Sequence, residues 1–189
     1  MPRSYIGELL CRQMESAGNE WHLGFDPGPV AAALDLCTGS GCLAILAALT
    51  FPDAVIAWSV KDVGRQPHDA VMTSDRTVVV TNEAGGGVVF VRDGAVVASL
   101  PAGPVQPGGV AAVGRYAAVA DVQGNGVWVY DGPTRSQVAQ GPVGVKLTHA
   151  VGLSDDLAAF ADTDGGAVYV ERISPQLSQV AKVDAPNKP

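Results

Sequence analysis

A glycine-rich turn between two apolar runs is the part of this sequence best suited to chemistry. Residues 34–42 read LDLCTGSGC, so an apolar run ends near Asp35 and a second apolar run with helical spacing follows the glycines. Glycines let a backbone approach a ligand closely, and the free N–H groups at the start of a helix bind an anionic group. We therefore expect a nucleotide-like cofactor site, in which Asp35 orients the turn or accepts a hydrogen bond from the ligand.

The elements that would position this turn follow from the apolar spacing on either side of it. Residues 30–36 are apolar apart from Asp35, which is typical of a buried parallel strand. Residues 42–51 have helical spacing, and residues 55–60 predict a second strand. A further helix is expected over residues 4–13, with Ser4 as its cap. The order strand, turn, helix, strand is the opening unit of a doubly wound α/β fold.

Two segments near the start of the sequence resemble a known protein family. PRSYIGELL near the start, followed by ALDLCTGSGCLAILAALTFPDA, resembles the ribosomal-protein glutamine N5-methyltransferases over about the first 57 residues. The resemblance implies S-adenosylmethionine as cofactor and places Arg3 and Ser4 near cofactor and substrate. The cofactor-binding positions that it implies are Asp35, Thr38, Gly39 and Gly41.

The sequence departs from this family at positions that the activity needs. The second strand of the family ends in an acid that holds the ribose hydroxyls, but Val60 stands there, and Asp62 lies two residues later. The family's Asn-Pro-Pro-Tyr motif, which grips the substrate glutamine, is absent from the sequence. We therefore assign no catalytic residue and expect a truncated segment, with methyl transfer to a ribosomal protein kept as the alternative.

The remainder of the chain repeats with a period of about 40 residues, which is in the range of β-propeller blades. Units begin at His68, Gly108 and His149, and a glycine-bearing turn in each predicts a hairpin. Each unit predicts four short strands. The positions taken as equivalent are Val71, Val110 and Val151, and then Asn82, Asp121 and Asp162.

The first unit contains VVVTN followed by VVFVRDG, which is similar to the YVTN family of propeller repeats. We therefore expect a mainly β chain, in which residues 1–62 form a truncated α/β, Rossmann-like methyltransferase segment and residues 63–189 form three four-stranded blades. Propellers typically have four to eight blades. Three blades would leave apolar sheet faces uncovered, so self-association through exposed blade edges is expected.

Composition excludes several classes of partner. The formal charge is −7 and no basic cluster occurs, so no nucleic-acid site is expected. No apolar run approaches the roughly 18 residues of a membrane span, and the start lacks the apolar region of a signal peptide. We therefore expect no membrane association and a cytoplasmic location.

No metal site is predicted from the histidines or the acidic turns. His68 and His149 lie near equivalent blade starts but have no placed carboxylate. The turn at residues 162–166 lacks the glutamate of a calcium loop, and Trp128 and Tyr130 are expected to pack between strands. The sequence as a whole predicts a chimeric or truncated, non-catalytic protein whose propeller module serves binding or scaffolding.

Overall fold

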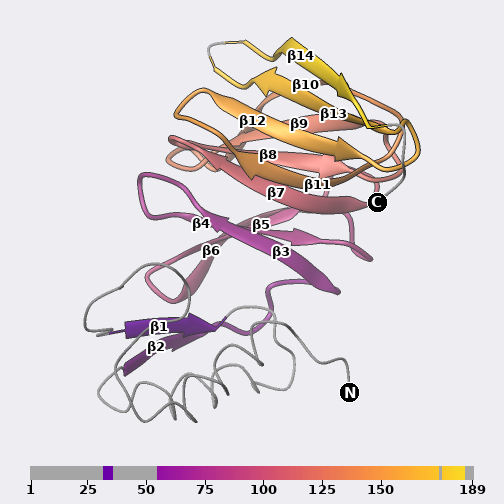
Figure 1. Ribbon diagram of the computed structural model, residues 1–189. Helices are drawn as coiled ribbons and strands as arrows, with labels where there is room; N and C mark the ends of the chain where they lie inside the picture. Colours follow the sequence, from indigo (N-terminus) through magenta and orange to yellow (C-terminus); the bar gives the residue numbers. More distant parts are fainter. Residues whose placement is uncertain (1–31, 36–54, 175, 186–189) are drawn as a thin grey trace, which may run out of the picture. The chain divides into compact units, whose positions relative to one another are not determined.

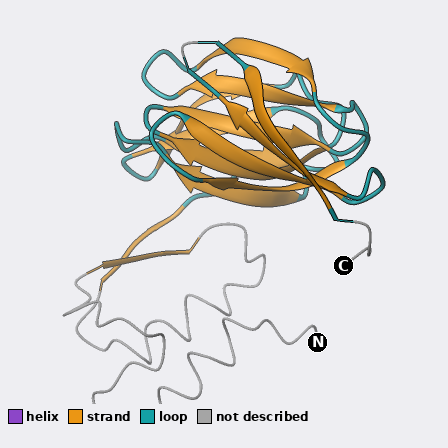
Figure 2. Ribbon diagram, turned by 45° about the horizontal axis from the view of Figure 1, so that its top comes forward, coloured by secondary structure: helices purple, strands orange, loops and turns teal. Residues whose placement is uncertain are grey.

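The computed structural model describes residues 32–35, 55–174 and 176–185. Fourteen strands lie in these ranges, and no helix occurs within them (Figure 1; Figure 2). The chain divides into the units Met1–Val60 and Lys61–Pro189. The helices predicted over residues 4–13 and 42–51 fall outside the described residues, as do Arg3 and Ser4.

The described part of the first unit is a pair of parallel strands. Strand β1 (Ala32–Asp35) lies beside β2 (Val55–Ser59), with Ala32 opposite Val55 and Asp35 opposite Ser59. Parallel neighbours need a crossover connection of about a dozen residues or more, and residues 36–54 supply it. The predicted parallel pairing of these two segments is confirmed.

The second unit consists of three four-stranded antiparallel sheets, stacked one on another in Figure 1. We call them blades I, II and III. Blade I contains β3 (Pro67–Met72), β4 (Val78–Asn82), β5 (Val88–Arg92) and β6 (Ala95–Leu100). Blade II contains β7 (Pro107–Val113), β8 (Tyr116–Asp121), β9 (Gly126–Asp131) and β10 (Ser136–Pro142). Blade III contains β11 (Leu147–Gly152), β12 (Leu157–Asp162), β13 (Ala167–Arg172) and β14 (Ser178–Asp184). The predicted fold class is confirmed.

Strand register defines which positions of the blades are equivalent. Asn82, Asp121 and Asp162 each pair with the first residue of the first strand of their blade, as the repeat predicts. The assignment of Val110 to the position of Val71 and Val151 is wrong by one residue. Ala111 occupies that position, because Ala111 pairs with Ala118 as Val71 pairs with Val79 and Val151 with Ala159.

Apolar side chains fill both spaces between consecutive blades. Alternate residues of a strand point to opposite faces of a sheet. Each strand of blade II therefore contributes side chains to both spaces, and the blade is covered on both faces. Ala117, Val119 and Tyr130 pack against blade I, where the rings of Phe90 and Tyr130 meet edge to face with centroids 6.2 Å apart. The opposite face of blade II, which includes Val129, packs against blade III.

The first strands of neighbouring blades approach closely. The backbone N–H of Val110 donates to the carboxylate of Asp69 over 3.0 Å, and the Thr81 hydroxyl donates to the carbonyl of Gly108 over 2.9 Å. A Cβ added to Gly109 would lie 2.7 Å from the backbone nitrogen of Ala150. Glycine is therefore required at position 109 to let β7 and β11 pack together.

An ion pair closes each blade between the start of its second strand and the end of its third. Arg92 pairs with Asp75 in blade I at 3.1 Å, and Arg172 pairs with Asp156 in blade III. Blade II reverses the order of charge. Its guanidinium comes from Arg115, before β8, and its carboxylate from Asp131, at the end of β9. The Arg115 guanidinium is the main reason that the pKa of Asp131 lies below its usual value.

Glu171 is an acid enclosed between blades II and III. It lies on β13, its residue is 2% exposed, and its Oε1 atom has no hydrogen-bond partner. Burial raises the pKa of Glu171 from 4.5 to about 6. The hydroxyl of Tyr130, at the equivalent position of blade II, is also buried without a partner, and burial raises its pKa as well.

We predict that Glu171→Gln removes a pH-dependent loss of stability. The unfolded chain loses this proton near pH 4.5 and the folded chain near pH 6. The free energy of unfolding therefore falls as pH rises through this window, by about 2 kcal/mol in total. Urea unfolding at several pH values checks this, with the half-buried Glu83→Gln as control. Equal slopes for wild type and Glu171→Gln between pH 4.5 and 6 would contradict it.

Candidate binding cleft at the loop edge of the blades

Buried aspartates at the ends of β8 and β12 hold the loops through which the chain enters their own blades, before β7 and β11. The carboxylate of Asp121 accepts hydrogen bonds from the backbone N–H groups of Val105 and Gln106, at 2.8 and 3.0 Å. It also accepts one from Gly124, at 2.9 Å. One fully buried side chain thus fixes both the loop before β7 and the turn after β8.

Asp162 repeats this arrangement one blade later. Its carboxylate accepts from the backbone N–H groups of Val145, Lys146 and Gly165 at 2.8, 3.0 and 2.8 Å. Burial opposes ionisation of Asp162, but the backbone hydrogen bonds outweigh it, so its pKa lies below the usual value. We call the two sets of bonds the aspartate clamps.

Blade I lacks the clamp, although it keeps the backbone pairing. The N–H of Glu83 donates to the carbonyl of Gln66 at 3.0 Å, as Val122 does to Gln106 at 2.9 Å. The equivalent of the clamp aspartate is Asn82, whose buried Oδ1 has no hydrogen-bond partner. The two aspartates, unlike Asn82, also accept from the N–H three residues later, which is a side-chain turn of the kind that Asp favours.

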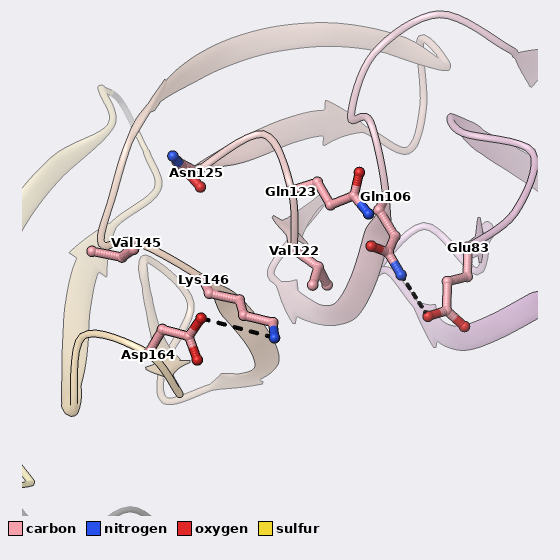
Figure 3. A pocket seen from close by; sticks show the side chains of 8 residues that line it. All are labelled: Glu83, Gln106, Val122, Gln123, Asn125, Val145, Lys146 and Asp164. Atoms are coloured by element: carbon pink, nitrogen blue, oxygen red, sulfur yellow. Dashed lines mark hydrogen bonds and ion pairs between the residues drawn. The ribbon is translucent and has the colours of Figure 1, made fainter.

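A cleft of about 690 Å³ opens between the clamped loops (Figure 3). Its walls come from the turns that follow β4, β8 and β12 and from the residues just before β7 and β11. The lining residues are Glu83, Gln106, Val122, Gln123, Asn125, Val145, Lys146 and Asp164.

The lining is polar and carries both charges. Gln106 donates from its side-chain amide to the carboxylate of Glu83 at 2.8 Å, and the Lys146 ammonium lies 3.9 Å from the Asp164 carboxylate (Figure 3). The described lining holds no histidine, cysteine, serine or threonine. Its chemistry is therefore hydrogen bonding and ion pairing to a bound group.

A second recess of about 250 Å³ shares Asn125 with the cleft. Its walls include Trp128 and the glycines at positions 124, 126 and 141. Trp128 is half-buried and also packs against the apolar core between blades I and II, as predicted from its place on a strand.

The sequence-predicted site residues are not gathered at this cleft. Asp35 is the last residue of β1, beside Ser59, while Thr38, Gly39 and Gly41 lie outside the described residues.

The two histidines considered as metal ligands lie on different strands. His68 is in β3, and His149 is in β11, where its Nδ1 atom lies 3.0 Å from the Thr148 hydroxyl. No group of three metal-ligating side chains occurs within the described ranges. The part of the chain that the structure describes contains no helix that could span a membrane.

Sequence reasoning missed the cleft because it treated the turns only as connections. The signal was present in the repeat, since Gln106 and Lys146 stand at the same position of consecutive units, one residue before the first strand. The role of these two residues becomes visible only in the structure, where this position and the turn after the second strand lie at the same edge of the blades.

No known protein-family profile matches the chain. A curated relative, the ribosomal protein uL3 glutamine methyltransferase of Bradyrhizobium diazoefficiens, is 55% identical over 56 residues, which is 30% of this chain and 18% of the relative. The enzyme of the same name from Burkholderia pseudomallei is 52% identical over 56 residues, 30% of this chain and 16% of that protein. The chain thus spans less than a fifth of the length of these relatives, and the resemblance of a segment to this family is confirmed.

Solved structures resemble the bladed part. A Kuenenia stuttgartiensis hydrazine synthase chain matches with a TM-score of 0.58 and 20% identity, over 68% of this chain and 38% of that one. A β-propeller domain of Cps50 (Swd1) from Myceliophteria thermophila matches with a TM-score of 0.51 and 14% identity, over 66% and 40% of the two chains. The three blades have the β-propeller fold. The bladed part spans less than half of each of these chains.

We predict that Asp162→Ala lowers the free energy of unfolding by roughly 2–4 kcal/mol. The substitution leaves three backbone N–H groups without their acceptor, and each unpaired buried group costs about 1–3 kcal/mol before water or relaxation compensates. Urea unfolding measures the change, and the exposed Asp155→Ala is the control. A loss equal to that of the control would show that the clamp does not hold the loops.

Proposed function

We propose that the bladed part of the chain is a non-catalytic binding or scaffolding module that holds a polar peptide in the loop-edge cleft. The aspartate clamps carry this proposal, because they fix the loops of the cleft before any ligand arrives. A preorganised site loses less conformational freedom on binding. The polar, mixed-charge lining supports binding through hydrogen bonds and ion pairs.

The lining favours a peptide over a compact small molecule. Small-molecule sites are mostly apolar and enclosed, whereas this cleft is open and rich in side-chain amides. Gln106, Gln123 and Asn125 each offer a donor and an acceptor, which a peptide backbone also needs. Two carboxylates face one ammonium group across the lining, so a ligand with a lysine or arginine side chain is favoured.

A phage-displayed random peptide library tests this function. Peptides selected on the wild-type chain should be rich in lysine and arginine and should lose at least tenfold in affinity for Asp164→Lys, which replaces a carboxylate of the lining by an ammonium group. A matched control is Asp184→Lys, because both aspartates are exposed and each lies beside a lysine, at 3.9 and 3.0 Å. Failure to select peptides, or peptides that bind wild type and Asp164→Lys equally, would overturn the proposal.

The second candidate function is S-adenosylmethionine-dependent glutamine methylation of a ribosomal protein. The 55% identity over 56 residues favours it, and so does the parallel pairing of β1 and β2, with Asp35 at the end of β1. Val60 at the place of the ribose-binding acid, and the missing Asn-Pro-Pro-Tyr motif, weigh against it. On the first proposal, residues 1–62 and 63–189 are units of different ancestry in a chimeric chain that works in the cytoplasm.

Calorimetric titration with S-adenosylmethionine separates the two candidates. The first predicts no binding heat at millimolar ligand. The second predicts a binding isotherm that is lost in Asp35→Ala and kept in Asp155→Ala, whose side chain lies in an exposed turn of blade III. Saturable heat that depends on Asp35 would establish a cofactor site and overturn the non-catalytic proposal.

A further inference from the structure

Each blade carries an equivalent row of four side chains on one of its two faces. In blades I and II this is the face toward the blade that follows in the sequence. Strand register defines the row, because the four residues are successive cross-strand partners. The rows are Val71–Val79–Phe90–Ala98 in blade I, Ala111–Ala118–Val129–Ala139 in blade II and Val151–Ala159–Val170–Ala181 in blade III.

In blades I and II this row forms the contact with the following blade. All four residues of the first row belong to the apolar core between blades I and II, and all four of the second to the core between blades II and III. The central pairs are closed to solvent: Val79 and Phe90 are 0% exposed, as are Ala118 and Val129. The row is thus the established interface of this fold.

In blade III the same row is open. Val151 is 56% exposed, and its three partners in the row are partly exposed. On the same face, Ala161, Val168 and Val183 form a second row that His149 begins, and Val183 is 58% exposed. The described part of the chain holds no fourth blade that could cover these residues. We call the two rows the outer face of blade III.

The outer face is complementary to itself in shape. Along the first row, large and small side chains alternate as Val, Ala, Val, Ala over β11, β12, β13 and β14. A two-fold axis that runs along the strands between β12 and β13 would place β13 of a second copy over β12. Each valine of the row then faces an alanine of the partner, and the side chains interdigitate as in packed sheets.

We propose that the outer face of blade III binds the same face of a second copy of this chain, across a two-fold axis between β12 and β13. Val170 of each copy fills the space over Ala159 of the other, and Val168 fills the space over Ala161. The contact continues the interface that joins the blades within one chain. The alternation of valine and alanine is the argument for a second copy as the occupant.

A head-to-tail arrangement is less favourable. It would place the outer face of blade III against the side of blade I that points away from blade II. The row there is Ala70–Val80–Val89–Ser99, as strand register defines it. Its two large side chains are neighbours, so they do not alternate with small ones as those of the first row of blade III do.

Sedimentation equilibrium of the full chain over a range of concentrations tests the proposal. We expect a reversible monomer–dimer equilibrium. Val151→Glu should raise the dimer dissociation constant at least tenfold, because it would bury a charge without a partner. The side chain is exposed in one chain, so the fold should survive. The control is Val138→Glu, on β10, whose side chain is 51% exposed and lies off this face.

A reciprocal exchange tests the two-fold arrangement itself. Ala159→Val should crowd the partner's Val170, and Val170→Ala should leave a gap, so each should weaken the dimer. The double variant should restore wild-type dimerisation, because each alanine again faces a valine. A wild-type monomer at all concentrations, open-ended association, or a double variant no better than the singles would overturn the proposal. Peptide binding at the loop-edge cleft is measured separately and does not depend on this outcome.

Discussion

Burial of sheet faces is the constraint on which this structure depends. A four-stranded blade with apolar residues on both sides is stable only when both sides are covered. Blade II meets this condition, since the strands in its centre are buried on both faces. The close approach that Gly109 permits and the edge-to-face contact of Phe90 with Tyr130 are consequences of the same need, because sheets must come near enough to exclude water.

The positions of the loops are a second consequence of this stacking. Within blades II and III the aspartate clamps connect the turn after the second strand to the entry of the first strand through backbone N–H groups. Stacking then brings these clamped edges side by side. Polar side chains can therefore stand in fixed positions at the loop edge without adding to the core. The cleft takes its shape from the stack, and its chemistry comes from residues that the stack leaves free to vary.

The fold was predictable from the sequence because turns and strands alternate with a regular period. The repeat and its glycine turns predicted four strands for each of the three blades, and it aligned the clamp positions Asp121 and Asp162 with each other. The exact register was not predictable from residue types, since Ala111 occupies a position that valine fills in the other blades. The burial of Glu171 was also hidden, because its enclosure depends on the neighbouring blade. The cleft was missed because its residues are distant in the chain and share only a position in the repeat.

The reversed ion pair of blade II affects which strands can pair with one another while the three similar sheets fold. If the strand after Arg115 paired with the third strand of blade I or III, two guanidinium groups would meet, with Arg92 or Arg172 as the second. If the strand after Asp75 paired with β9, two carboxylates would meet, those of Asp75 and Asp131. Repulsion in the wrong pairings and attraction in the right one act as a matching code. The strands of blade II are thereby kept apart from those of blades I and III, which share one order of charge.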